Sequence, residues 1–191
     1  MSKLIVSEFV SLNGVMEAPG GEATHPHTGW TFKSLYGEDH YAYKGTELEE
    51  AETLLLGRKT YEGFAAAWPT RDRTDPFTDK INSTPKYVIS STLTDPEWEN
   101  TTVLPGDPIE EVSKLREADG GPILVNGSAQ LVHALAEAGL VDEYRAMVHP
   151  VLVADGLRMF PDPAVMQKLR LTDCIAYESG VALLIYEPAA D

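Results

Sequence analysis

The stretch LLLGRKTY, residues 54–61, decides the fold that we expect for this chain. Its three leucines fit a short buried strand, and Gly57 permits a sharp exit and the close approach of a ligand. Residues 61–68 are compatible with a helix. A strand that ends in glycine and opens a helix presents free backbone N–H groups, which suit a phosphate. The adjacent cations Arg58 and Lys59 favour a phosphate site, and a solvated cation pair on an ordinary turn is the alternative.

The same arrangement occurs again further along the chain. Residues 122–130, PILVNGSAQ, read as a buried strand, a glycine turn and a helix start, and residues 86–92, KYVISST, as a strand ending in three hydroxyls. In a parallel sheet the strand ends at Gly57, Ser90 and Asn126 share one rim, outside which ligands bind. Several such turns along a rim suit a dinucleotide. Neither a G-x-G-x-x-G motif nor a P-loop motif is present, which argues against the common dinucleotide fold and against an ATPase.

Helical patterns alternate with strand patterns over the first 140 residues, and the chain ends in strand patterns alone. This order predicts one α/β domain, residues 1–191, with a mostly parallel sheet and a C-terminal antiparallel hairpin. We expect residues 65–80 to be irregular, and Pro150 to mark an edge or a bend in the strand pattern of residues 144–153. The other expected helices and strands are residues 3–12 (strand), 38–52 (helix), 107–118 (helix), 129–138 (helix), and 169–177 and 181–186 (hairpin).

Composition limits the possible partners. The chain has 191 residues and a net charge of −15, from 15 basic and 30 acidic residues, which argues against nucleic acid and anionic membranes as partners. The single cysteine, Cys174, excludes a disulfide framework within the chain and disfavours a cysteine zinc site, so we predict no metal. The sequence shows no signal-peptide pattern and no apolar run long enough to span a bilayer, so we expect a cytoplasmic protein.

Seven segments, in order along nearly the whole chain, resemble the dihydrofolate reductase-like superfamily. The resemblance is closest to the riboflavin-biosynthesis reductase domain, the C-terminal domain of the bifunctional deaminase-reductase, and its stand-alone relatives. It implies a three-layer α/β fold with helices on both faces of a mixed sheet, an NADPH-dependent reductase and a homodimer. The segments are residues 10–16, 55–62, 86–92, 125–131, 139–144, 149–152 and 157–161.

The resemblance also implies a role for each part of the cofactor site. One departure concerns the third turn, where dihydrofolate reductases have a Gly-Gly pair and this chain has Asn126-Gly127, so an unusual peptide geometry there is left open. The implied positions are Arg58, Lys59 and Thr60 with Gly57 for the 2′-phosphate and pyrophosphate; Ser90, Ser91 and Thr92 for the adenosine end; Asn126, Gly127, Ser128, Ala129 and Gln130 for the pyrophosphate; and Val6, Ser7, Asn13, Gly14, Val15 and Met16 for the nicotinamide.

The substrate half of the site is less defined by the sequence. Pterin reduction needs a carboxylate on the first long helix, where Glu38, Asp39 and Glu47 are candidates. We take Asp39 as the predicted catalytic acid, and a helix N-terminal acid without a catalytic role is the alternative. The riboflavin-type reaction, which reduces a ribosylamino group to ribitylamino, needs a phosphate anchor instead. Candidates for that anchor are Lys33, Arg71, Arg73 and Arg158.

Three functions remain open at this point. Riboflavin-type reduction of a small ribosylamino-pyrimidine is the first. Dihydrofolate reductase activity is the second, and a nucleotide-binding protein without reductase activity is the third. The full riboflavin enzyme also has a zinc deaminase domain with a P-C-x-x-C motif, which a chain with one cysteine lacks.

Overall fold

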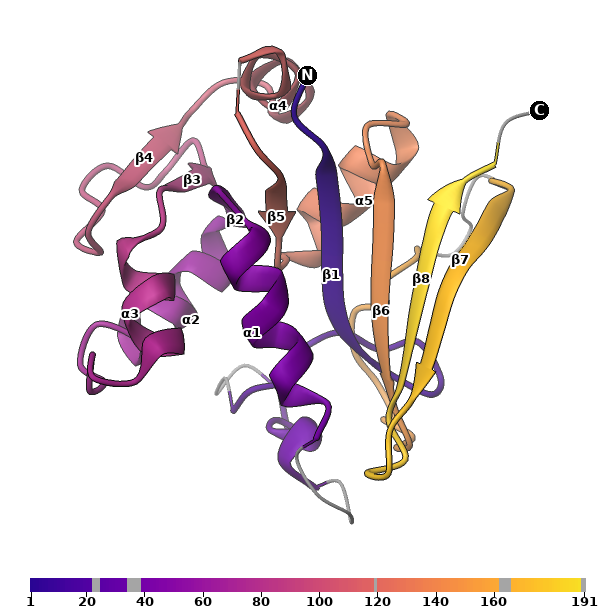
Figure 1. Ribbon diagram of the computed structural model, residues 1–191. Coiled ribbons are helices and arrows are strands. Elements are labelled where there is room, and N and C mark those ends of the chain that lie inside the picture. The colour runs from indigo at the N-terminus through magenta and orange to yellow at the C-terminus, as the bar shows by residue number, and fades with distance from the viewer. Residues whose placement is uncertain (22–24, 34–38, 119, 162–165, 190–191) are drawn as a thin grey trace.

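The computed structural model describes residues 1–21, 25–33, 39–118, 120–161 and 166–189. Its strands form one eight-stranded sheet in the order β4-β3-β2-β5-β1-β6-β8-β7 (Figure 1). Neighbours from β4 to β6 run parallel, whereas β8 runs antiparallel to both β6 and β7. The strands are β1 (Leu4–Ser11), β2 (Thr53–Gly57), β3 (Lys86–Ile89), β4 (Thr101–Leu104), β5 (Ile123–Val125), β6 (Glu143–His149), β7 (Leu169–Ala176) and β8 (Ala182–Pro188).

Helices cover both faces of this sheet, so the predicted three-layer fold is confirmed. Helices α1, α2 and α3 lie on one face and α4 and α5 on the other (Figure 1). Each face has its own apolar core: Leu48, Tyr61 and Ile81 pack in one, and Val112 and Leu135 in the other. The helices are η1 (Trp30–Lys33, a 3₁₀ helix), α1 (Tyr41–Glu50), α2 (Arg58–Ala67), α3 (Pro76–Ser83), α4 (Pro108–Glu117) and α5 (Ala129–Glu137).

One expectation about local structure was wrong, and another was met in one of its two forms. The segment expected to be irregular contains α3, whose start has a local signal: the side chain of Asp75 accepts a hydrogen bond from the Thr78 N–H, and Pro76 occupies the first turn. Pro150 lies in a bend, one of the two outcomes expected for it, and not at a sheet edge, because β6 ends one residue before it, at His149, and lies between β1 and β8. The proline therefore stops an interior strand.

The described residues contain neither a candidate membrane-spanning helix nor a candidate metal site. Among these residues, no helix combines the length and apolar character needed to cross a bilayer. Within the same ranges, no group of three or more His, Cys, Asp or Glu side chains is placed to hold a metal ion.

Candidate functional site

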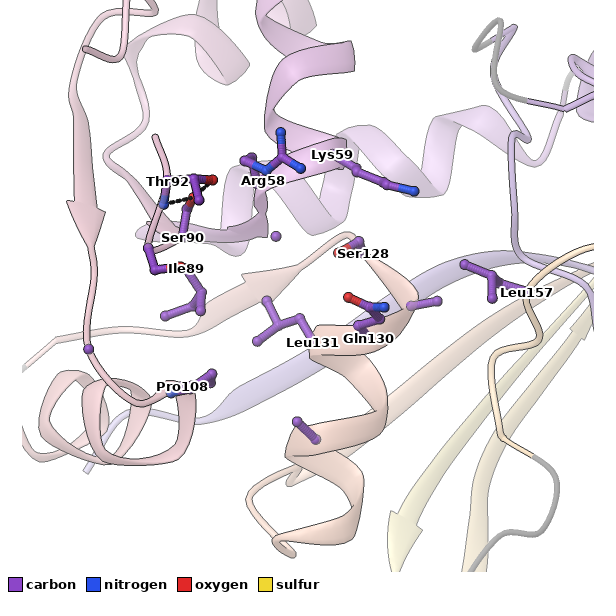
Figure 2. Close-up of a pocket in the computed structure, with 15 residues that line it drawn as sticks. Arg58, Lys59, Ile89, Ser90, Thr92, Pro108, Ser128, Gln130, Leu131 and Leu157 are labelled. Atoms are coloured by element: carbon purple, nitrogen blue, oxygen red, sulfur yellow. Dashed lines mark hydrogen bonds between the residues drawn. The ribbon is translucent and has the colours of Figure 1, made fainter. Parts of the chain in front are cut away.

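A pocket of about 470 Å³ lies at the carboxyl ends of β2, β3 and β5 (Figure 2). It brings together segments that are far apart in the sequence, and nine of the residues predicted for the cofactor line it. These nine are Gly57, Arg58, Lys59, Ser90, Ser91, Thr92, Ser128, Ala129 and Gln130. The rest of the wall is Ile89, Gly106, Pro108, Leu131, Ala134 and Leu157.

Two helices begin at this pocket without a capping side chain. Helix α2 follows Gly57, which has no side chain to cap it, and α5 follows Ser128, whose side chain accepts no hydrogen bond from the helix. The first N–H groups of a helix have no acceptor within it, and they lie at the positive end of the helix dipole. Both helix starts therefore offer donors to an anionic group in the pocket.

The two helix starts are held tightly against each other. The N–H of Gly57 donates to the carbonyl of Gly127 over 3.0 Å. A Cβ on Gly57 would lie 2.9 Å from the Ser128 nitrogen, and one on Gly127 would lie 2.8 Å from the Thr60 Oγ1. Gly127 has φ +87, and the peptide bond that is cis joins Gly127 to Ser128, one bond beyond Asn126-Gly127. This glycine cradle, with free helix donors beside it, fits a pyrophosphate.

The two cationic side chains at the pocket, Arg58 and Lys59, extend toward different ends of it. In Figure 2, Arg58 lies on the side of Ser90 and Thr92, and Lys59 extends toward the side of Ser128 and Leu157. The Arg58 guanidinium pairs with Glu62 on its own helix at 2.8 Å and is about half exposed. Because this pair is exposed, a ligand phosphate can compete for Arg58 at small cost.

The three hydroxyl residues that follow β3, Ser90, Ser91 and Thr92, differ in burial and in their hydrogen bonds. The Ser90 Oγ accepts hydrogen bonds from the N–H groups of Thr92 and Leu93, at 3.2 and 3.0 Å. Ser90 is buried, whereas Ser91 is exposed. Ser90 therefore stabilises the turn, and all three residues line the pocket.

The predicted nicotinamide positions lie beside this pocket rather than in its wall. Strand β1 pairs with β5 only from Leu4 to Val6, because β5 ends at Val125. The next residue, Asn126, donates from Nδ2 to the carbonyl of Ser7 at 2.9 Å. Beyond Ser7, none of the described strands pairs with the side of β1 that faces β5, although β6 pairs with the other side as far as Ser11.

The loop of residues 13–16 is fixed to a distant segment. The Asn13 side chain donates to the Val153 carbonyl at 2.7 Å and accepts from the Val153 N–H at 3.1 Å. The Met16 N–H donates to the carbonyl of Leu157 at 2.9 Å, and the Met159 N–H donates to the carbonyl of Gly14 at 3.0 Å. Because Leu157 also lines the pocket, this loop and the pocket rim form one hydrogen-bonded unit.

The structure places Asp39 away from these residues. Its carboxylate accepts a hydrogen bond from the Glu178 N–H at 2.8 Å, in the turn between β7 and β8. Partial burial would raise the pKa of Asp39, but hydrogen bonds from Ser179 and Glu178 hold it below its ordinary value. Its role as the catalytic acid stays a prediction. Of the other two candidates, Glu38 lies outside the described residues.

Glu47 on α1 is the candidate acid that reaches the sheet. Its carboxylate is buried and accepts from the Ser7 Oγ at 2.7 Å, with Lys44 Nζ at 2.9 Å and Arg145 Nη1 at 3.4 Å. Lys44 also donates to the Ser7 Oγ at 2.6 Å. Ser7 is therefore the centre of a buried polar cluster beneath α1.

Sequence reasoning missed a second acid, Glu8, which is 7% exposed. Burial raises its pKa to about 8, against the opposing effects of Lys44 and of the Gly127 backbone, with Glu47 adding to the rise. Its Oε1 is enclosed and has no hydrogen-bond partner among the described residues. The signal in the sequence was the one charged residue of β1, in the middle of a mostly apolar strand.

Residues 2–183 match the family model for the RibD C-terminal domain. The chain belongs to this family. Among curated relatives, the RibD-domain chain is similar to the uncharacterized protein YyaP of Bacillus subtilis strain 168, with 30% identity covering 96% of this chain and 94% of YyaP. It is also similar to the uncharacterized protein YwjB of the same strain, with 26% identity covering 95% of each chain.

Solved structures show the same fold. A putative riboflavin biosynthesis protein from Shewanella sp. PV-4 superposes with a TM-score of 0.74 at 17% identity, covering 98% of this RibD-domain chain and 99% of that one. A pyrimidine reductase-like protein from Corynebacterium diphtheriae gives 0.61 at 13% identity, covering 100% and 93%. The Thermotoga maritima diaminohydroxyphosphoribosylaminopyrimidine deaminase/5-amino-6-(5-phosphoribosylamino)uracil reductase gives 0.67 at 12% identity, and this chain spans 57% of it.

Proposed function

We propose that this protein is an NADPH-dependent reductase that transfers hydride to a ribosylamino-pyrimidine, as in riboflavin biosynthesis. The observation that carries the proposal is the pair of uncapped helix starts, α2 and α5, joined through Gly57 and Gly127 at one pocket. Membership of the RibD C-terminal domain family supports the reaction class, and the names of two structural neighbours refer to pyrimidine or uracil reductases.

Each part of the cofactor would meet chemistry suited to it. The N–H groups at the starts of α2 and α5 would hold the pyrophosphate, and Arg58 would turn from Glu62 to the 2′-phosphate. The nicotinamide would lie along the unpaired side of β1 beyond Ser7, covered by residues 13–16. When bound there, a reduced nicotinamide supplies the hydride, and the protein orients it and excludes water.

Two measurements test this proposal. Calorimetric titration of the protein with NADPH and with NADH should show binding of both, with NADPH the tighter ligand. NADPH oxidation, followed by its absorbance, should then proceed with 5-amino-6-(5-phosphoribosylamino)uracil and not with dihydrofolate. Turnover of dihydrofolate alone would make this a pterin reductase, and nucleotide binding without turnover of either substrate would make it a binding protein.

The homodimer stays a prediction. Sedimentation velocity with and without NADPH would test it.

A further inference from the structure

The carboxyl of Glu8 is an unusual buried group. It is 7% exposed, and its enclosed Oε1 has no hydrogen-bond partner among the described residues. Leaving a buried polar atom without a partner costs free energy, so such an atom calls for an explanation. A bound ligand that supplies a hydrogen-bond partner for Oε1 would be such an explanation.

Glu8 is also in the right place to meet a ligand. It lies on the stretch of β1 that pairs with β6 and that, within the described part of the chain, has no strand on its other side, because β5 has already ended. The Gly127 backbone, part of the glycine cradle, lies against its carboxyl. Glu8 therefore lies beside the glycine cradle, on the stretch of β1 along which the nicotinamide is proposed to lie.

The other described candidate acids, Glu47 and Asp39, already have hydrogen-bond or ion-pair partners within the protein. The Glu47 carboxylate is enclosed by Ser7, Lys44 and Arg145. Asp39 is held by the β7–β8 turn. A group that donates a proton must hold one at neutral pH, and burial raises the pKa of Glu8 to about 8.

We propose that Glu8 is the proton donor of the reductase site and that it acts on the nitrogen of a substrate carbon–nitrogen double bond. This proposal rests on the proposed nicotinamide-dependent function. In its open-chain form a ribosylamino group is an imine. Its carbon takes the hydride that the reduced nicotinamide supplies, and the π electrons of the broken double bond form an N–H bond with the Glu8 proton. The products are an amine, oxidised nicotinamide and the Glu8 carboxylate, which water reprotonates.

The charged groups around Glu8 suit this cycle. Lys44 on α1 and the N–H of Gly127 stabilise the carboxylate that proton transfer leaves, and Glu47 opposes it. Burial favours the return of the proton. The oxidised nicotinamide ring is positively charged and the reduced ring is neutral. A carboxylate formed beside the nicotinamide therefore attracts the oxidised ring more strongly.

The first experiment needs no turnover. The affinities of NADP⁺ and NADPH are measured by calorimetry on both sides of pH 8 for the wild type and for Glu8→Gln, which keeps the size of the side chain. In the wild type, NADP⁺ should gain roughly tenfold in affinity over NADPH as Glu8 loses its proton. In Glu8→Gln the ratio of the two affinities should not change with pH.

The second experiment measures kcat against pH with the ribosylamino-pyrimidine. Glu8→Gln should lower kcat roughly a hundredfold or more and abolish the decline that the wild type shows as pH rises through about 8. Glu8→Asp should keep that decline at a reduced kcat, because it retains a proton. The matched control is Glu117→Gln, on the exposed end of α4, which should behave as the wild type.

The outcomes separate the two proposals. If the wild type turns over and Glu8→Gln keeps its kcat and its pH profile, the Glu8 proposal alone is overturned. If the wild type binds neither nucleotide, the proposed function falls and the Glu8 role falls with it. Binding of both nucleotides without reduction of the ribosylamino-pyrimidine overturns the substrate class and the proton transfer, whereas nicotinamide binding still stands.

Discussion

The helices α2 and α5 begin differently from α3 and α4. Helices α3 and α4 each start with aspartate and proline, and Asp75 and Asp107 accept hydrogen bonds from the first turn of their own helices. Helices α2 and α5 start after Gly57 and Ser128, with no side chain in that role. The aspartate caps add stability to the fold, whereas the open starts give up that contribution and keep their donors for a ligand.

Helix α4 makes the difference sharper. Gly106 and Pro108 also line the pocket, so three helices begin at its wall. Because Asp107 satisfies the N–H groups of Ile109 and Glu110, and proline has none, the start of α4 has little to offer an anion. The phosphates are therefore expected between α2 and α5.

Closing an open helix start should have the largest effect on binding. Ser128→Asp places a carboxylate at the N-terminus of α5, where it competes with the cofactor phosphates for the same donors. We expect the NADPH affinity to fall roughly a hundredfold or more, with no loss in the free energy of unfolding. Calorimetry and urea unfolding measure both quantities, and unchanged NADPH affinity would contradict the assignment of α5 to the phosphates.

Removing the cation beside the start of α2 comes next. Arg58→Ala should weaken NADPH binding roughly ten- to hundredfold and NADH binding much less, because NADH lacks the 2′-phosphate. The matched control is Glu62→Gln, which removes the ion-pair partner of Arg58 and should leave NADPH affinity equal or higher. Equal losses for both nucleotides in Arg58→Ala would exclude a role at the 2′-phosphate.

Filling the glycine cradle tests the close contact between the two open starts. Gly127→Ala puts a Cβ 2.8 Å from the Thr60 Oγ1 on a backbone with φ +87, so we expect a loss of about 1–3 kcal/mol in unfolding free energy and weaker NADPH binding. Gly139→Ala, at φ +66 with nothing within 4 Å, imposes backbone strain alone. NADPH binding that suffers equally in both variants would argue against the cradle.

Removing a closed cap should have the smallest effect. Asp107→Ala frees the donors of α4 and should cost about 1 kcal/mol of unfolding free energy. NADPH affinity should stay within about twofold of the wild type, because we expect the start of α4 to contribute less than about 0.5 kcal/mol to the binding free energy. A larger change, in either direction, would show that α4 takes part in phosphate binding.

The elements around the pocket could be predicted from the sequence because their signals are local. An apolar run, a glycine and a helix start are all contained within about ten residues, as in residues 54–61. One local signal was overlooked. The aspartate–proline pair at Asp75 is as clear a helix start as the pair at Asp107, yet residues 65–80 were expected to be irregular.

The sequence by itself determined which segments are strands and which turns carry glycine, since backbone sterics and burial act on near neighbours. Only the tertiary structure decided which helix starts share one pocket, that Glu47 on α1 reaches Ser7 on β1, and that Glu8 lies buried against Gly127. These relations depend on where β5 stops beside β1 and on what surrounds each carboxyl, and residues distant in the sequence set both.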